Sequence, residues 1–261
     1  MRLPGGRQRA SKPFATELPE WLPPLTTQGL RARLQEQVFG RRGWGFHDVL
    51  THEVSEVRIA RVVQWVRDFA GDPAHLRIID LGAYEGAHSL ALARAGAEVV
   101  SIEGREDNAR HILAAKEAEG LDNLSVVVGD ARHEIAQHGI FDVVVCLGLL
   151  YHFTAAELGP FLDAVVATNC ELAIVETQIG LSSPKGFAYR GHTYRGIESP
   201  EVVERPAASL NNPVSFWPTK PSLLNLLSRA GFTSIAEARV PSIAVLAAFQ
   251  DHVALIAKRS R

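Results

Sequence analysis

Residues 78–86 read Ile-Ile-Asp-Leu-Gly-Ala-Tyr-Glu-Gly and are the most informative segment of the sequence. A short apolar strand leads into a glycine turn, and a helix begins at Gly86. Gly82 lets the backbone approach a ligand where a Cβ atom would collide, and the helix start presents free N–H groups. A dinucleotide site needs Gly-x-Gly-x-x-Gly, but Tyr84 stands at the third position and obstructs a pyrophosphate. The stretch therefore favours a ligand without phosphates.

Strands and helices alternate along the chain beyond this stretch. Apolar runs predict strands at 77–81, 98–102, 124–128, 141–147 and 171–176, with helices near 86–95, 106–119, 131–138 and 155–168. A helix at about 220–230 and strands near 232–240 and 251–258 follow. Fully apolar strands that alternate with helices are typical of an α/β fold with a parallel sheet covered on both faces.

Two acidic residues end the second and third of these strands. Glu103 lies 21 residues after Gly82, where a carboxylate can accept both hydroxyls of a ribose. Asp130 follows the third strand and can accept a hydrogen bond from an adenine amine. Either acid alone could instead cap the helix that follows it. Together with the glycine turn, the two acids are expected to line one crevice at the carboxyl ends of the strands.

These motifs resemble those of the class I S-adenosylmethionine-dependent methyltransferases, over about residues 75–180 and 214–260. Residues 80–86 resemble the first motif of that family, Glu103 its ribose acid, residues 129–131 its adenine-side motif and residues 141–153 its fourth strand and following loop. The resemblance implies a Rossmann-like, mostly parallel seven-stranded sheet whose last strand is antiparallel, with helices on both faces. It also implies S-adenosyl-L-methionine as cofactor, bound by Asp80, Gly82, Ala83, Tyr84, Gly86, Glu103, Gly104, Asp130, Ala131 and Leu147.

The loop after the fourth strand holds the candidate catalytic residues. His152 follows that strand, in a loop expected to face cofactor and acceptor, and an unperturbed histidine titrates near neutrality. We interpret His152 as a general base, and Tyr151 as a residue that positions the acceptor or the sulfonium. The alternative is that His152 caps a helix or packs.

Residues 181–218 form a long proline-rich segment with little periodicity, which predicts a lid over the acceptor or a mobile surface loop. Aromatic and donor groups are dense between residues 189 and 195. The predicted acceptor-binding residues are Arg190, His192, Tyr194 and Trp217 from this segment, with Trp44 and Phe46 on the opposite wall.

A metal site is not predicted. His47, His52 and Glu53 are the candidate ligands. The five-residue separation of His47 and His52 does not match the i, i+3 or i+4 spacing of a helical ligand pair. The cation-dependent catechol-type methyltransferases carry acids after the fourth strand, where this chain has Leu147, Gly148 and Leu149. The resemblance therefore implies a metal-independent reaction.

The amino-acid composition excludes several classes of protein. With 261 residues, 46% hydrophobic, 21% charged and a net charge of −2, the chain is neither disordered, collagen-like nor a coiled coil, and it has no overall basic field. Residues 1–42 nevertheless hold eight basic and three acidic side chains. We predict a basic arm (1–26), a helical cap (27–74) and a catalytic domain (75–261).

Cys146 and Cys170 are expected to be reduced core residues. Because neither a membrane span nor a secretory signal is predicted, a soluble cytoplasmic protein is expected.

The leading hypothesis is transfer of a methyl group to an O or N atom of a small-molecule acceptor. The segment 216–232, with residues 150–152, also resembles the tRNA wobble-uridine carboxymethyltransferases, which use a carboxylated cofactor. Arg42 could face that carboxylate, but the arginine expected near residues 211–215 is missing. A tRNA-modifying enzyme whose basic arm contacts phosphates is thus the first alternative, and a non-catalytic S-adenosylmethionine-binding protein the second. The sequence leaves the acceptor and the oligomeric state open.

Overall fold

The computed structural model describes residues 46–201, 209–210, 212–238 and 251–260, with side chains from Arg58 onward. The chain forms two compact units, Met1–His52 and Glu53–Arg261, and only residues 46–52 of the first are described. The predicted arm, residues 27–45 of the predicted helical cap, and the side chains of Trp44 and Phe46 lie outside the described residues. The fold below is that of the second unit.

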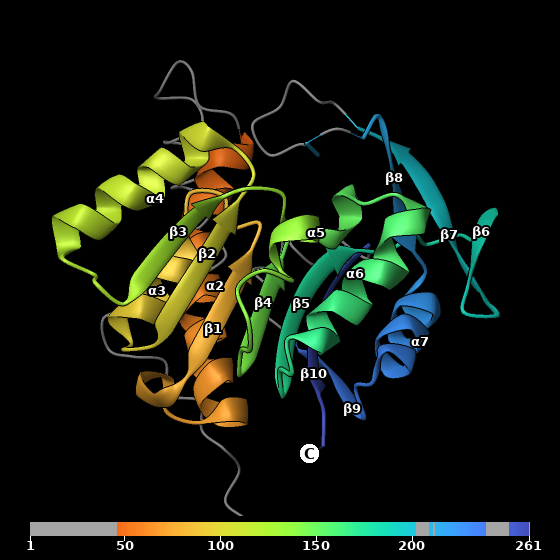
Figure 1. The fold of residues 1–261 in the computed structure, drawn as a ribbon. Helices are drawn as coiled ribbons and strands as arrows, with labels where there is room; N and C mark the ends of the chain where they lie inside the picture. The colour runs from red at the N-terminus through yellow and green to blue at the C-terminus, as the bar shows by residue number, and fades with distance from the viewer. Residues whose placement is uncertain (1–45, 202–208, 211, 239–250, 261) are drawn as a thin grey trace, which may run out of the picture. The chain divides into compact units, whose positions relative to one another are not determined.

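A seven-stranded sheet forms the centre of this unit, in the order β3-β2-β1-β4-β5-β10-β9 (Figure 1). Its strands are β1 (Arg77–Leu81), β2 (Glu98–Glu103), β3 (Leu124–Val128), β4 (Val143–Leu147), β5 (Leu172–Gln178), β9 (Ser234–Ala238) and β10 (His252–Lys258). The first five are parallel, and β10 runs antiparallel to both β5 and β9. The predicted fold class is confirmed. The chain reverses its direction of travel across the sheet between β1 and β4, where ligands bind in folds of this type.

Helices cover both faces of the sheet, which is why its central strands are apolar on both sides. The helices are α2 (Phe46–Ala70), α3 (Ala87–Arg94), α4 (Glu106–Glu119), α5 (Ala131–Glu134), α6 (Ala155–Ala167) and α7 (Lys220–Ala230), with short 3₁₀ turns η1 (Pro73–His75) and η2 (Leu150–His152). Within the described residues, no helix combines the length and apolar character needed to cross a membrane.

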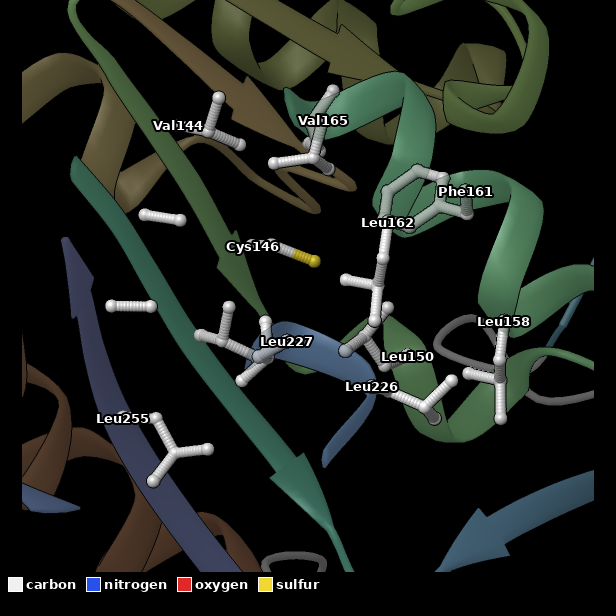
Figure 2. Close-up of a cluster of buried hydrophobic side chains, with 14 of the residues drawn as sticks. Val144, Cys146, Leu150, Leu158, Phe161, Leu162, Val165, Leu226, Leu227 and Leu255 are labelled. Atoms are coloured by element: carbon white, nitrogen blue, oxygen red, sulfur yellow. The ribbon is translucent and has the colours of Figure 1, made fainter. Parts of the chain in front are cut away.

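Successive residues of β4 serve two different cores. Val144 and Cys146 point toward α6 and α7, where they meet Leu162 and Leu227 (Figure 2). Val145, between them, belongs to the opposite core, together with Val62, Trp65 and Val66 of α2. The last turns of α2 are therefore part of the sheet's own core, and the compact unit begins at Glu53, inside the predicted cap.

Residues 181–218 contain a second, three-stranded antiparallel sheet made of β6 (Lys185–Tyr189), β7 (His192–Pro200) and β8 (Val214–Pro218). The expectation of little regular structure here was wrong. Two of the prolines that suggested a loop are the last residues of strands: Pro218 ends the edge strand β8, and Pro200 lies beyond the part of β7 that pairs with β6. The inward face of this insertion is aromatic, since Phe187 stacks on Tyr194 and meets Phe216 edge-on.

Candidate active site

The carboxyl ends of β1, β2 and β3 are joined by backbone hydrogen bonds. The N–H groups of Gly82 and Ala83 donate to the carbonyl of Ile102 at 2.9 and 3.0 Å, and Gly129 N–H donates to the carbonyl of Glu103 at 3.0 Å. The glycine turn and the two predicted acids therefore meet along one edge of the sheet, as the sequence predicts.

The turn after β1 is built from left-handed residues. Gly82, Tyr84 and Gly86 have φ angles of +73°, +55° and +80°. A Cβ atom at Gly86 would lie 2.7 Å from Ile112, and one at Gly82 would lie 3.0 Å from Leu149. The chain thus requires these glycines for its own packing as well as for any ligand. Tyr84, 44% exposed, faces outward from the turn.

Glu103 is a buried carboxylate fixed by three donors. Its Oε2 accepts from Tyr84 N–H at 2.7 Å, while its Oε1 accepts from Arg105 N–H at 2.9 Å and from Asn108 Nδ2 at 3.2 Å. Oε2 has a single donor among the described residues, so it retains capacity to accept a hydrogen bond from a hydroxyl.

Asp130 has a strong partner within the protein. It caps α5 by accepting from Arg132 N–H at 2.9 Å, and it also accepts from Arg132 Nε at 2.9 Å. Burial works to raise the pKa of Asp130, but the Arg132 hydrogen bonds hold it below its ordinary value. Arg132 also pairs with Glu157. The helix-capping alternative thus describes the local role of Asp130, and an adenine amine would have to share this carboxylate with Arg132.

At the end of β4, Tyr151 and His152 form η2, with ring centroids 4.3 Å apart. His152 Nδ1 lies 2.9 Å from Glu201 Oε1, and the two side chains are only 14% and 10% exposed. The Tyr151 hydroxyl lies next to Gly148, 3.4 Å from where a Cβ would stand, and burial raises the pKa of Tyr151.

The insertion holds this turn in place. Asn212 Nδ2 donates to the His152 carbonyl at 2.7 Å, and Trp217 Nε1 donates to the Tyr151 carbonyl at 3.0 Å. The described residues of the insertion's return limb, 209–210 and 212–217, also approach the carboxyl end of β2, because a Cβ at Gly104 would lie 2.5 Å from Leu210. The insertion therefore contacts the turns that follow both β2 and β4.

A polar cluster that the sequence reasoning missed lies beside Leu147 at the end of β5. Glu176 pairs in register with Leu147 and accepts from Arg58 Nε at 2.7 Å, and its other oxygen lies 2.7 Å from His252 Nε2. His88, on the first turn of α3, has an Nε2 atom that is closed to solvent and lacks a hydrogen-bond partner in the described part of the chain. Burial, aided by Arg58, lowers the pKa of His88 to about 4, so it is neutral at pH 7.

Comparisons with known proteins agree with this geometry. Residues 78–168 match a methyltransferase domain family. The N-terminal domain of EvdMO1, solved in the presence of S-adenosylhomocysteine (SAH) and D-fucose, is 26% identical, with a TM-score of 0.62 over 91% of this chain and 98% of that one. Residues 78–168 thus form a methyltransferase domain, and the second unit has the fold of the class I S-adenosylmethionine-dependent methyltransferases.

Two curated relatives match shorter stretches of this methyltransferase. A 23S rRNA (uracil(1939)-C(5))-methyltransferase of Shewanella amazonensis is 34% identical over 84 residues, 32% of this chain and 18% of that protein. A ubiquinone biosynthesis O-methyltransferase of Bordetella avium is 30% identical over 107 residues, 39% of this chain and 40% of that protein. The matches thus span well under half the length of these relatives.

S-adenosylmethionine is the cofactor of this methyltransferase, and the described residues suit it. Tyr84 stands where a dinucleotide site has a glycine, so the turn does not let a pyrophosphate approach the backbone closely. The Glu103 carboxylate is fixed in place, and its Oε2 can still accept a hydrogen bond from a ribose hydroxyl. Among the described residues, the buried Nε2 of His88 has no hydrogen-bond partner, which is consistent with a polar ligand group next to the first turn of α3.

Three predicted acceptor-binding residues of the methyltransferase lie elsewhere. Arg190, His192 and Tyr194 line a pocket of about 330 Å³ between α6, α7 and the β6–β7 hairpin. Since β7 rises about 3.3 Å per residue from His192 to Pro200, His192 lies roughly 30 Å from Glu201, the partner of His152. The structure therefore does not bring them to the end of β4, because this aromatic segment forms the far end of a hairpin. Tyr194 is instead a core residue, 2% exposed.

Some residues of the methyltransferase site could have been identified from the sequence pattern, whereas others could not. Glu176 lies near the carboxyl end of an apolar strand, the same signal that identified Glu103. Glu201 and His252 come from distant segments and follow no local motif. No group of three or more His, Cys, Asp or Glu side chains among the described residues is placed to hold a metal ion, and the side chains of His47, His52 and Glu53 are outside that set.

Proposed function

We propose that this protein transfers the methyl group of S-adenosylmethionine to an oxygen or nitrogen atom of a small-molecule acceptor, with His152 as the general base. The observation that carries the proposal is the 2.9 Å contact between His152 Nδ1 and Glu201 Oε1 at the end of β4. That end of the strand adjoins the carboxyl ends of β1 to β3, and the Nε2 atom of the imidazole has no hydrogen-bond partner among the described residues.

Each group at the site has its own role in the proposed methyl transfer. The bound cofactor supplies an already activated methyl group. Glu201 accepts the Nδ1 proton of His152, which leaves the lone pair on Nε2 to take a proton from the attacking hydroxyl or ammonium group. Tyr151 and the return limb of the insertion confine the acceptor and exclude water, so that most of the acceleration comes from alignment.

Several observations support a small molecule as the acceptor. The EvdMO1 domain was solved with D-fucose present, and the Bordetella avium relative is a ubiquinone biosynthesis O-methyltransferase. Return-limb residues pack against the carboxyl edge, with Leu210 on Gly104 and Asn212 on His152, which favours an acceptor that can fit beneath them.

A nucleic-acid acceptor is the second candidate, favoured by the rRNA methyltransferase relative and by the basic residues 1–42. Phosphate contacts make affinity fall steeply with salt, whereas a neutral metabolite is nearly indifferent to it. Salt dependence of turnover therefore separates the two candidates.

The experiment uses S-adenosylmethionine with a trideuterated methyl group, incubated with a panel of hydroxyl and amine metabolites and, separately, with total tRNA and rRNA. We expect mass spectrometry to find the label in a small molecule. His152→Ala should lower the rate by about 10²–10⁴ without changing SAH affinity. Label found only in RNA would contradict the acceptor class, and a wild-type rate in His152→Ala would contradict the base. SAH binding without product from any acceptor would support a non-catalytic role.

A further inference from the structure

A pocket that the proposed methyl transfer does not use lies between α6, α7 and the β6–β7 hairpin. Its volume is about 330 Å³, which is within the range of small-molecule sites. The hairpin wall comes from the segment 189–195, which stands out in the sequence for its density of aromatic and donor groups. The charges and hydrogen bonds of the three walls indicate what this pocket can bind.

A buried tyrosine on the pocket wall has a hydroxyl without a hydrogen-bond partner in the described part of the chain. Tyr194 of β7 is only 2% exposed, and its ring stacks on Phe187 with the ring centroids 5.3 Å apart. Among the described residues, only His88 has a polar side-chain atom that is both closed to solvent and unpartnered. The Tyr194 hydroxyl is therefore open, and the opening that Tyr194 lines is this pocket. Hydroxyls of buried tyrosines usually have a partner, so this one points to a ligand that accepts its hydrogen bond.

The charges on the pocket wall leave one cation uncompensated. Asp163 Oδ2 lies 2.8 Å from Arg190 Nη2 and also accepts a hydrogen bond from the Tyr189 hydroxyl. The charges of Asp163 and Arg190 therefore offset each other. Arg229, in the last turn of α7, has no carboxylate within ion-pair distance among the described residues, and its Nη1 instead donates to His192 Nε2 at 2.6 Å. The described residues thus give the pocket a net positive charge, which favours an anionic ligand.

The remaining donors of Arg229 suit a carboxylate or a phosphate. The bond from Nη1 to His192 orients the guanidinium, while Nε and Nη2 form no hydrogen bond to another residue that the structure describes. Two adjacent N–H groups of a guanidinium can bind two oxygens of a carboxylate or phosphate in parallel. Since His192 Nε2 accepts the bond from Arg229, the imidazole carries its proton on Nδ1, which is a further donor.

Part of the pocket wall is apolar. Leu226 belongs to it, and so does the Tyr189 ring, which lies against α6 because Gly159 has no Cβ atom that would overlap it. We propose that this pocket binds a small organic anion through Arg229 and Tyr194, which donate to its carboxylate or phosphate group. The Tyr189 ring and Leu226 then contact its apolar body. This site goes beyond the proposed function and does not depend on which acceptor is methylated.

The test uses the full chain saturated with SAH, so that added anions do not bind in place of the cofactor. Calorimetry measures the binding of benzoate and phenyl phosphate, of benzamide as the neutral analogue, and of inorganic phosphate as an anion without an apolar body. We expect at least one of the two organic anions to bind, and benzamide and inorganic phosphate to bind at least ten-fold more weakly. The tighter of the two organic anions shows whether the pocket favours a carboxylate or a phosphate.

Two variants locate the site. Arg229→Gln should weaken binding of the organic anion at least ten-fold and Tyr194→Phe about five-fold, with SAH affinity unchanged in both. Arg229 is exposed, so its substitution leaves the core intact. Lys220→Gln is the matched control, because Lys220 lies on the same helix but pairs with Glu237, and it should leave anion binding unchanged.

Three results would overturn the proposal. The first is that neither organic anion binds, or that benzamide binds as tightly as benzoate. The second is that Arg229→Gln leaves anion affinity unchanged, which would place the anion elsewhere. The third is an equal loss of affinity in Lys220→Gln and Arg229→Gln, which would show general attraction to positive charge. None of these results depends on methyl transfer, so failure here is distinct from failure of the proposed function.

Discussion

His152 and Glu201 are separated by 49 residues, yet His152 Nδ1 lies 2.9 Å from Glu201 Oε1. His152 follows the fourth strand of the sheet, whereas Glu201 follows β7 of the insertion. A carboxylate of the insertion therefore contacts the candidate base and fixes the orientation of its imidazole.

Glu201→Gln tests this relationship. A neutral amide cannot stabilise the imidazolium that forms as His152 takes a proton, so we expect the methyl-transfer rate to fall roughly 10–100-fold with SAH affinity unchanged. Glu198→Gln is the control, because Glu198 lies in the same insertion but is exposed and pairs with Lys185. An equal loss of rate in both variants, measured from pH 6 to 9, would contradict the positioning role.

Asp80 is expected to make the free energy of unfolding depend on pH, and this contribution can be measured separately from that of other groups. Burial raises the pKa of this carboxyl from 3.8 to about 6. A raised carboxyl pKa stabilises the fold below pH 3.8, and this stabilisation is lost as the pH rises through about 6. Between pH 5 and 7 the group should lower the free energy of unfolding by about 1–2 kcal/mol.

Urea unfolding of wild type and Asp80→Asn at the two pH values measures this contribution. The groups that titrate in the opposite sense, His88 among them, are common to both proteins and cancel in the difference. A pH dependence identical in the two proteins would show that Asp80 is not buried as the carboxylic acid.

The two cysteines are predicted to be chemically inert in the native state. Cys146 and Cys170 are each 1% exposed, and burial raises the pKa of both thiols. A maleimide reagent at pH 8 should leave the native protein unmodified and modify both thiols in urea. Rapid modification of either thiol in the native protein would contradict the packing in Figure 2, where Cys146 lies against the α6 side chains.

Gly86→Ala is predicted to destabilise the domain more than Gly120→Ala. Both glycines have positive φ, +80° and +64°, but only the first would bring a Cβ against Ile112, at 2.7 Å. The shared backbone strain costs about 1–2 kcal/mol, and the contact with Ile112 adds to it at Gly86. Urea midpoints of the two variants compare these costs, and equal midpoints would argue against this packing of the turn.

The cofactor side of the site could be predicted from the sequence because it follows local rules. A strand, a glycine turn and a helix are contiguous at residues 78–86, and parallel strands bring Glu103 and Asp130 to the same edge. What the sequence could not show is that Asp130 already has Arg132 as its partner, since that pairing depends on how the α5 turn folds.

The acceptor side depends on long-range folding, and of the residues predicted there from the insertion the structure brings only Trp217 to the turn after β4. Density of aromatic and donor groups singled out residues 189–195, but such density does not say which end of a hairpin faces the site. Glu201 and Asn212 reach His152 only because the insertion folds back along β8. Arg58 is brought to Glu176 from 118 residues away by the packing of α2 on the sheet.

The central claim is that the crevice at the carboxyl ends of β1–β3 binds S-adenosylmethionine. Calorimetric titration of the full chain with SAH and with NAD⁺ tests it most directly, because both ligands carry an adenosine but only NAD⁺ carries a pyrophosphate. We predict that SAH binds at one site per chain and that Glu103→Ala weakens it at least ten-fold, while NAD⁺ gives no binding heat. Binding of NAD⁺ in place of SAH, or SAH binding unaffected by Glu103→Ala, would contradict this account.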